Sequence, residues 1–275
     1  MTLTEFVFKA RRRLLTYLWH IQTKLTPNKL AEFALPCGGR FMYPLNSAIG
    51  KTMYAGGFEN AELAFVRHSL QPGAVVIDVG ANGGIYAVTA ARQIGPTGHV
   101  YAFEPATAEV AILRKNVEIN NLTNVTVIES AVSHETGTAQ FAIADDGALN
   151  SLAQTGHPDQ HVTKWETVKT ITLDDFVRET SIPRVDFLKI DVEGAEKLVL
   201  DGAKELLASV TPLTILFESM TVNVGAFGYS VRDFLQELLA QGLSISFIND
   251  NGTLTAITEV DDRCGRDFWN FVARN

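Results

Sequence analysis

The sequence contains few cysteines, no long apolar run and no excess of positive charge. Its two cysteines, Cys37 and Cys264, lie far apart in the 275 residues and form neither a C-x-x-C pair nor a disulfide framework. We therefore expect a reducing compartment. No apolar run approaches the ~20 residues that span a bilayer. The net charge of −8 argues against a general nucleic-acid binder, because such proteins need a basic surface to neutralise phosphates.

The charge is unevenly distributed, because the first 30 residues are basic and the remainder is acidic. Residues 1–30 contain one acid, Glu5, and carry about +5, which leaves about −13 for the rest. The basic residues are Lys9, Arg11, Arg12, Arg13, Lys24 and Lys29. Tyr17, His20 and Gln22 interrupt the apolar block after the arginines, so we do not expect a secretory signal. Two interpretations stay open: a solvated helix packed on the domain, or a helix that contacts an anionic membrane surface or a partner.

Short apolar segments and amphipathic segments alternate from about residue 60 onward. Seven segments have the apolar, β-branched composition of buried strands. They are residues 74–79, 98–104, 124–132, 185–192, 211–219, 243–249 and 266–273. Helical patterns separate most of them, which predicts an α/β fold with a mostly parallel sheet and helices on both faces. Residues 35–50 indicate a small β element, and residues 138–173 a hairpin-like insertion with a long polar loop.

A glycine-rich turn follows the first of these strands, in the stretch VVIDVGANGG. Asp78, Gly80 and Gly84 form a D-x-G-x-x-x-G pattern, whose glycines allow a sharp turn and a close approach of the backbone to a ligand. The dinucleotide fingerprint G-x-G-x-x-G fails at Asn82 and Ile85, and no Gly-Lys-Ser/Thr run of a P-loop follows. Glu104 ends the second strand about twenty residues later, where an acid accepts hydrogen bonds from both ribose hydroxyls. A loop for adenosine without pyrophosphate therefore remains, and S-adenosylmethionine fits it.

Acidic residues end two later strands and predict a second polar site at the same edge of the sheet. Lys189 and Asp191 share one strand face, Glu193 follows, and Glu218 ends the next strand. A carboxylate at this position could remove the proton of a hydroxyl during methyl transfer. Two alternatives stay open: Lys189 could be a buried lysine that neutralises Asp191 or Glu218, and Glu193 could cap the next helix.

The same acids could also form a metal site. Asp191, Glu193 and Glu218 could supply oxygen ligands to Mg²⁺. His157 and His161 stand in an expected loop without a third soft ligand for zinc. We predict that the protein uses no metal.

The chain resembles the FkbM family of S-adenosylmethionine-dependent methyltransferases. The resemblance rests on the motifs VVIDVGANGG, AFEP, AVS, ITLDDF, LKIDVEGAE and LFE, in this order, and covers roughly residues 55–275. It implies a class I methyltransferase (Rossmann-like) fold with a seven-stranded sheet, formed by residues 56–275 after an N-terminal extension of residues 1–55. It also implies that Glu59 faces the cofactor and that Asn150 belongs to a substrate-binding loop.

These observations lead to a prediction for each part of the site. The residues expected to bind the cofactor are Glu59, Asp78, Gly80, Ala81, Asn82, Gly83, Gly84, Glu104, Pro105 and Ala131. Those expected to be catalytic are Lys189, Asp191 and Glu218, and those expected to contact the acceptor are Asn150 and Glu193.

The predicted function is O-methylation of a hydroxyl on a sugar, glycan or secondary metabolite. We expect a cytoplasmic enzyme, at the inner membrane surface if residues 1–30 contact lipid, that does not bind nucleic acid. The alternatives are N-methylation or protein methylation, and a non-catalytic adenosine-binding scaffold of the same fold. No N/D-P-P-Y motif of amino-group methyltransferases occurs.

Overall fold

The computed structural model describes residues 3–26, 29–36, 38–209, 211–267 and 269–275, and in helix α1 it describes side chains only from residue 14 onward. The helices are α1 (Leu3–Leu25), α2 (Ala48–Tyr54), α3 (Asn60–Ser69), α4 (Ile85–Ile94), α5 (Thr107–Ile119), α6 (Leu173–Thr180), α7 (Glu196–Asp201), α8 (Lys204–Leu207), α9 (Thr221–Val224) and α10 (Val231–Ala240), with short 3-10 turns η1 (Gly147–Leu149) and η2 (Gly225–Phe227). The strands are β1 (Leu30–Ala34), β2 (Arg40–Pro44), β3 (Val75–Val79), β4 (His99–Phe103), β5 (Val125–Ile128), β6 (Ala131–Val132), β7 (Gly137–Ala144), β8 (Val162–Ile171), β9 (Phe187–Ile190), β10 (Thr214–Glu218), β11 (Ser244–Ile248), β12 (Leu254–Ala256) and β13 (Asn270–Arg274).

The central sheet has eight strands in the order β12-β11-β13-β10-β9-β3-β4-β5. Strands β10, β9, β3, β4 and β5 pair in parallel, whereas β13 pairs antiparallel with both β10 and β11. The expected mostly parallel α/β sheet is thereby confirmed. The expected count of seven is wrong by one, because β12 adds a three-residue edge strand that is too short to give a recognisable pattern.

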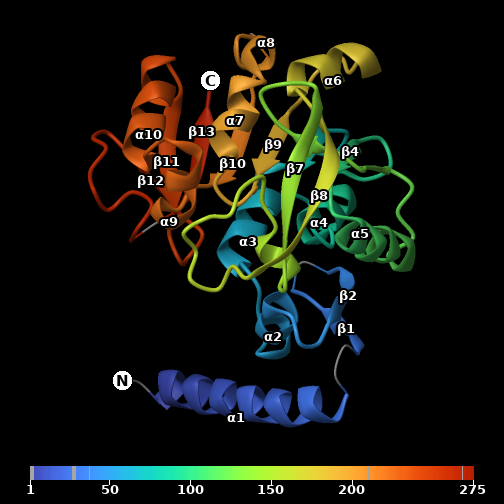
Figure 1. Ribbon diagram of the computed structural model, residues 1–275. Helices are drawn as coiled ribbons and strands as arrows, with labels where there is room; N and C mark the ends of the chain where they lie inside the picture. Colours follow the sequence, from blue (N-terminus) through green and yellow to red (C-terminus); the bar gives the residue numbers. More distant parts are fainter. Residues whose placement is uncertain (1–2, 27–28, 37, 210, 268) are drawn as a thin grey trace.

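Helices cover both faces of this sheet (Figure 1). Successive residues of a strand point to opposite faces, so Val76 packs in one apolar cluster and Ile77 in the other. Helices α3, α4 and α5 contribute to the cluster of Val76, and α6, α7 and α10 to that of Ile77. The helix expected after the glycine loop ends at Gly95, and Ser230 caps α10 by accepting a hydrogen bond from the Asp233 backbone N–H, both as predicted.

The insertion forms a separate three-stranded sheet in the order β6-β8-β7. Strands β7 and β8 are antiparallel, which confirms the predicted hairpin, and η1 lies in the loop that joins them. The expected strand 124–132 is divided, because β6 leaves the central sheet and pairs with β8. The insertion is therefore tied to the carboxyl edge of the main sheet at residues 131–132.

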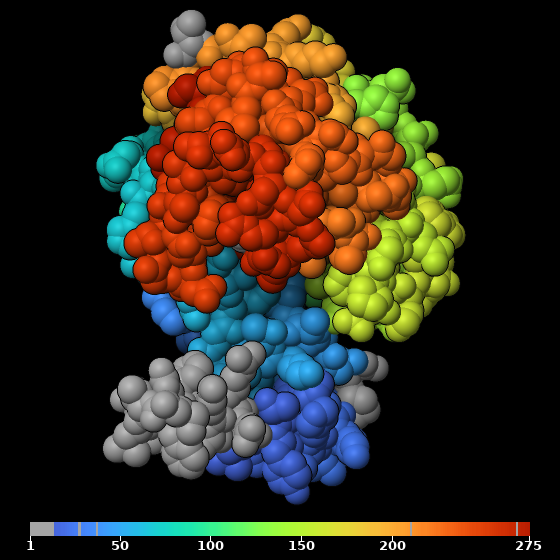
Figure 2. All heavy atoms as spheres, turned by 90° about the vertical axis from the view of Figure 1, so that its left-hand side faces the viewer, coloured from blue at the N-terminus to red at the C-terminus, as the bar shows by residue number. Residues whose placement is uncertain are grey.

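The N-terminal segment consists of α1, the hairpin β1–β2 and α2, and it lies at the lower end of the molecule in Figures 1 and 2. Phe41 and Tyr43 of β2 are buried in the same cluster as α3 and α4. The side chain of Asn116 in α5 holds β2, accepting from the Met42 N–H at 2.6 Å and donating to the Met42 carbonyl at 3.2 Å. Helix α1 lies outside this core and packs on α2.

Cys264 is buried, and Cys37 lies outside the described residues. Among the helices that the structure describes, none combines the length and apolar composition needed to cross a bilayer.

Candidate active site

A cavity of about 220 Å³ lies at the carboxyl ends of β3, β4, β9 and β10. This edge is where open parallel sheets bind ligands. Twelve of the fifteen predicted site residues line it: Glu59, Gly80, Ala81, Asn82, Glu104, Pro105, Ala131, Asn150, Lys189, Asp191, Glu193 and Glu218. Asp78, Gly83 and Gly84 are not among the lining residues. The structure therefore brings most of the two predicted clusters together in one cavity.

The glycine loop is shaped by contacts with the protein itself. Gly80 has φ +76°, and a Cβ built on it would lie 1.7 Å from the backbone oxygen of Asp191. A Cβ on Gly83 would lie 2.3 Å from the Tyr43 hydroxyl oxygen, and one on Gly84 2.3 Å from Leu113 Cδ1. Glycine at position 80 thus allows the backbone of the glycine loop to contact the backbone at Asp191. This contact joins the predicted cofactor cluster to the predicted acidic cluster.

Asn82 orders the loop in a left-handed conformation with φ +48°, which Asn tolerates better than most residues. Its Oδ1 accepts a hydrogen bond from the Gly83 N–H at 2.6 Å, and its Nδ2 donates to the Gly147 carbonyl at 3.1 Å. The second bond connects the loop to η1 of the insertion.

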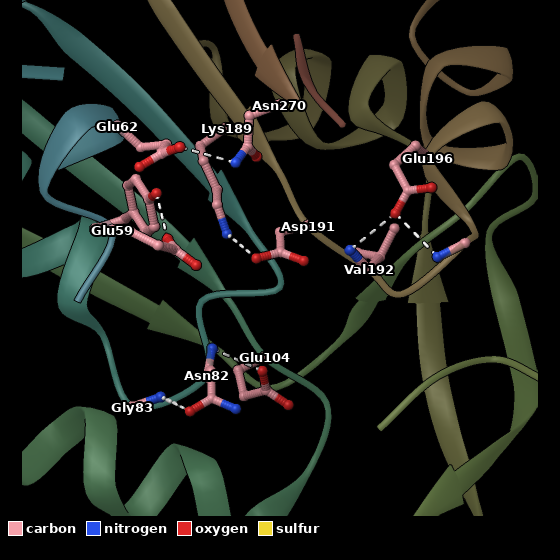
Figure 3. A network of polar contacts seen from close by, with 12 residues as sticks. Glu59, Glu62, Asn82, Gly83, Glu104, Lys189, Asp191, Val192, Glu196 and Asn270 are labelled. Atoms are coloured by element: carbon pink, nitrogen blue, oxygen red, sulfur yellow. Dashed lines mark hydrogen bonds and ion pairs between the residues drawn. The ribbon is translucent and has the colours of Figure 1, made fainter. Parts of the chain in front are cut away.

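Glu104 is a buried carboxyl group at the end of β4, shown in Figure 3 beside Asn82. It accepts hydrogen bonds from the backbone N–H of Asn82 and of Ala106, each at 2.9 Å and each on a different oxygen. Burial raises its pKa to about 8 despite these bonds, and Glu109 and Asp78 add to the rise. Each carboxylate oxygen can accept a further hydrogen bond, so Glu104 can still receive two hydroxyl donors.

Asp78 is also buried, and neither of its carboxylate oxygens has a hydrogen-bond partner among the described residues. Burial raises its pKa to about 6, and the charge of Lys189 opposes that rise. Buried polar groups are normally paired. Asp78 does not line the cavity, and the nearby charge of Lys189 offsets its own.

Lys189 stands between the carboxylates at the centre of Figure 3. Its Nζ lies 2.8 Å from Asp191 Oδ2 and 4.5 Å from the centre of the Tyr86 ring. Burial alone would lower the pKa of Lys189, but Asp191, Asp78 and Glu59 outweigh burial and raise it. Lys189 therefore stays protonated and pairs with Asp191. This agrees with the alternative in which Lys189 is a buried lysine that neutralises Asp191.

Glu59 faces this pair from the start of α3. The Tyr86 hydroxyl donates to Glu59 Oε2 at 2.5 Å. Burial raises the pKa of Glu59 to about 7, with a further rise from Asp191 and opposition from Lys189. At neutral pH this carboxyl group is close to half ionised.

Asp191, Glu193 and Glu218 form a tight acidic cluster, with one oxygen of each within 4.8 Å of the others. Burial, and then the charge of Asp191, raises the pKa of both Glu193 and Glu218. Within the described part of the chain this is the one group of His, Cys, Asp and Glu close enough to hold a metal ion. The absence of a metal stays a prediction.

The structure decides how the segment after β9 is capped. Glu196 Oε1 accepts from the backbone N–H of Val192 and of Gly194, at 3.2 and 3.0 Å. Glu193 has φ +53°, and its Oε2 accepts from Asn223 Nδ2 at 2.7 Å. The alternative that Glu193 caps the next helix is therefore wrong, because no side chain caps α7 and Glu193 lies in the cavity wall, where it bonds Asn223.

Asn150 and Ser151 join the insertion to the acidic cluster. Asn150 Oδ1 accepts from the Ala144 N–H at 2.8 Å, while its buried Nδ2 has no partner among the described residues. Ser151 Oγ donates to the Glu193 carbonyl at 2.9 Å. The insertion thus offers an unused donor in the cavity wall.

Sequence reasoning missed the wall that the N-terminal segment supplies. Tyr43 of β2 and Ala48, Ile49 and Thr52 of α2 line the cavity. Asp146 of the insertion accepts from the Ala48 N–H at 2.6 Å and also caps η1. The alternating pattern of residues 40–45 indicates that Tyr43 is buried, but nothing local to it indicates that α2 reaches the site. Tyr86, also missed, is the second residue of α4.

The residues present fit S-adenosylmethionine. Glu104 suits a ribose. The cavity beside Lys189 is rich in acids and therefore suits the positive charges of the methionine part. The orphaned Asn150 Nδ2 supplies a donor.

Comparison with known proteins gives one family match and several distant relatives. Residues 78–245 match the methyltransferase FkbM domain. The chain is 29% identical over 149 residues to 2-O-methyltransferase NoeI of Sinorhizobium fredii, covering 50% of this chain and 60% of that protein. It is 31% identical over 172 residues to 31-O-demethyl-FK506 methyltransferase FkbM of Streptomyces tacrolimicus, covering 51% and 64%. It is 29% identical over 163 residues to hexuronic acid methyltransferase AglP of Haloferax volcanii, covering 59% and 62%. The chain therefore spans less than two thirds of the length of these relatives.

Proposed function

Because the chain belongs to the FkbM methyltransferase family, we propose that it transfers the methyl group of S-adenosylmethionine to a hydroxyl of a sugar, glycan or secondary metabolite. The observation that carries the proposal is the Lys189–Asp191 pair at 2.8 Å, in a cavity that Glu104 and the glycine loop also line. A positioned carboxylate and a nucleoside site in one cavity are what methyl transfer to a hydroxyl requires.

The names of the relatives support oxygen as the acceptor atom. NoeI and FkbM are both described as O-methyltransferases, and AglP acts on a hexuronic acid. Sugars and secondary metabolites are thus both represented, and a glycan is the acceptor that we favour.

The cofactor supplies an electrophilic methyl group on a sulfonium sulfur. Glu104 would hold the ribose hydroxyls, and the acids that line the cavity would supply negative charge near the methionine part. Lys189 fixes Asp191 Oδ2, which leaves Asp191 Oδ1 to accept the proton of the acceptor hydroxyl. A fixed orientation within hydrogen-bond reach of the hydroxyl is what a general base needs.

Glu193 and Glu218 take a different role in this proposal. Their raised pKa favours the protonated form, in which a carboxyl group can donate a hydrogen bond to an acceptor oxygen. Protonation also limits the negative charge near the sulfonium, whose positive charge is lost in the transition state. One cluster of acids therefore supplies both a base and hydrogen-bond donors.

The proposal extends to domain organisation and location. Residues 56–275 form the catalytic domain, and residues 1–55 form an extension whose β2 and α2 complete the cavity wall. The protein acts in the cytoplasm, at the inner membrane surface, with residues 1–30 as the contact. The positive charge of this segment on an otherwise acidic chain supports that contact.

The test combines calorimetry with a transfer assay. The intact protein is expected to bind S-adenosylmethionine and to label hydroxyls in a panel of sugars and glycans when the methyl group is isotopically marked. Asp191→Asn is expected to lower kcat by about 100-fold or more, with a smaller loss of cofactor affinity because one negative charge leaves the cavity. The matched control is Asp201→Asn, which breaks a similar Lys–Asp pair (Lys197–Asp201, 3.1 Å) outside the cavity.

Three results would count against the proposal. Absence of cofactor binding by the intact protein would refute it. Label on nitrogen would favour the N-methylation alternative, and cofactor binding with no transfer to any acceptor in the panel would favour the scaffold alternative.

A further inference from the structure

The outward face of α1 carries a stripe of exposed apolar side chains. Leu14, Tyr17, Leu18, Ile21 and Leu25 are between 41% and 76% exposed. Their spacing of three and four residues places them along one side of a helix. We call these five residues the outer stripe.

The opposite side of α1 is fixed to the body of the protein. Trp19 Nε1 donates to the Leu45 carbonyl at 2.5 Å, and the Lys51 ammonium lies 5.2 Å from the centre of the Trp19 ring. Lys51 belongs to α2 and Leu45 precedes it. The helix is therefore anchored by one side while the outer stripe points away from the protein.

The charge of the segment indicates what covers the outer stripe. Six of the first 30 residues are lysine or arginine, and Glu5 is the one acid among them. An amphipathic helix rich in basic residues lies in the interface of an anionic bilayer, where each cation near the surface contributes about 1 kcal/mol. A symmetric pairing of two copies through α1 would instead bring two segments of about +5 together, which is unfavourable.

The mouth of the cavity opens beside the same anchor. Ala48 and Thr52 of α2 line the cavity and are also exposed to solvent, so this part of α2 borders the opening. Helix α1 packs on α2, and both lie at the same end of the molecule (Figure 1). A surface that binds the outer stripe would therefore lie next to the opening.

We propose that the outer stripe of α1 docks on an anionic lipid bilayer, and that the acceptor hydroxyl belongs to a molecule carried in that bilayer. The second part rests on the proposed methyl transfer, because it names the acceptor of the same cavity. A lipid-borne acceptor is delivered to the opening that α2 borders, without leaving the membrane.

Vesicle flotation tests the docking. The full chain is expected to float with vesicles of phosphatidylcholine and phosphatidylglycerol and to stay behind with phosphatidylcholine alone. The double change Leu18→Gln and Ile21→Gln is expected to weaken binding by at least about tenfold. His20→Gln, at an exposed polar position of the same helix, is the control and should bind as the parent does. No flotation with anionic vesicles, or equal flotation of the double variant, would overturn the proposal.

Sedimentation without vesicles tests the competing occupant. The parent chain and the Leu18→Gln and Ile21→Gln variant are expected to sediment alike at every concentration, so that any self-association is unchanged by the double change. A dimer that the double change abolishes would assign the outer stripe to a second copy and overturn the proposal.

A fluorescence experiment tests which end of the molecule faces the membrane. A fluorophore is placed on Thr52→Cys at the opening, or on Lys204→Cys of α8 at the opposite end (Figure 1), each with Cys37→Ser. Nitroxide-labelled headgroups are expected to quench the label at position 52 and to spare the label at 204. Equal quenching of both, or stronger quenching at 204, would refute a membrane-facing opening.

Calorimetry separates failure of this inference from failure of the proposed function. The Leu18→Gln and Ile21→Gln variant is expected to bind S-adenosylmethionine as tightly as the parent, because the outer stripe is remote from the cavity lining. If the double variant loses lipid binding but still binds the cofactor, the change affects docking and leaves the cofactor site intact. Absent cofactor binding in the parent refutes methyl transfer, whatever the vesicles show.

Discussion

Glu104 is a buried carboxyl group whose charged neighbours, Glu109 and Asp78, are also acids. Its pKa of about 8 means that most of it is protonated at neutral pH in the free protein. Hydroxyl donors of a ribose favour the ionised form, so cofactor binding must release a proton below that pH.

We therefore expect the affinity for S-adenosylmethionine to rise by up to about tenfold per pH unit between pH 6 and 8, and then to level off. Calorimetry at several pH values, in two buffers of different ionisation enthalpy, measures both the affinity and the released proton. Glu104→Gln should bind more weakly and reduce the pH dependence, the remainder coming from Asp78 and Glu59. An affinity that does not change with pH would contradict the assignment.

The raised pKa of Glu59 predicts how the stability of the protein depends on pH. A carboxyl group whose folded pKa is raised from 4.5 to about 7 contributes its full stability below pH 4.5 and loses it as the pH rises through 7. At pH 8 the cost is on the order of 3 kcal/mol. Glu59→Gln should therefore be more stable than the parent at pH 8 and about equal to it at pH 4.5, because Gln still accepts from Tyr86.

Urea unfolding at the two pH values measures this difference. Glu135→Gln is the control, since that side chain is 83% exposed and removes the same charge. A stability gap between Glu59→Gln and the parent that is independent of pH would show that the effect is not ionisation.

At the scale of elements, the contact between the glycine loop and the segment after β9 sets a sharp steric limit. Gly80→Ala would place a methyl group on the Asp191 carbonyl and would also strain a positive φ. We expect a loss of stability of more than about 3 kcal/mol, or failure to fold. Gly228→Ala is the matched control, because Gly228 has the same φ of +76° but a Cβ there meets no atom within 4 Å.

Only the backbone strain of about 1–2 kcal/mol is expected for Gly228→Ala, whose φ of 76° and ψ of 21° lie in the left-handed region. Denaturant unfolding compares the two variants. Equal losses would mean that the conformation of Gly80, and not its contact with Asp191, makes glycine necessary.

Elements that have strong local signals were predictable from the sequence. Gly95 by its backbone freedom and Ser230 by its capping side chain mark helix ends, and Glu104 and Asp191 follow strands whose apolar composition is plain. The hydrogen bonds of Glu196 to the loop amides of Val192 and Gly194 were not predictable, because they depend on the left-handed conformation of Glu193. The division of residues 124–132 between two sheets was equally hidden, since both partners are distant in sequence.

At the scale of the whole molecule, the cavity is assembled from segments that are far apart in the chain. The strand ends supply one side, and β2, α2 and the insertion supply the other. The strand side follows from β–α alternation, because parallel strands end at one edge. The other side could not be predicted, since the position of α2 depends on long-range contacts such as that between Ala48 and Asp146.

We expect cofactor binding to slow backbone hydrogen exchange in several of these segments at once. Protection should appear in residues 43–52, 80–86, 147–152 and 189–193, because each segment lines the cavity. Residues 204–207 and 231–240 serve as references and should not change. Protection confined to residues 80–86 would show that the insertion and α2 do not enclose the cofactor.

The hydrogen bond between Asp146 and the Ala48 N–H joins the two walls that lie outside the central sheet. The insertion is also bonded to the strand-end loops, through Asn82 to Gly147 and through Ser151 to Glu193. A designer who wants a new acceptor range should therefore exchange residues 45–54 and 145–152 as a pair and keep Asp146, Gly147 and Ser151, since these residues hold the two walls together and to the strand ends. Proteins with the same strand-end residues could have come to methylate different acceptors through paired changes in these two segments.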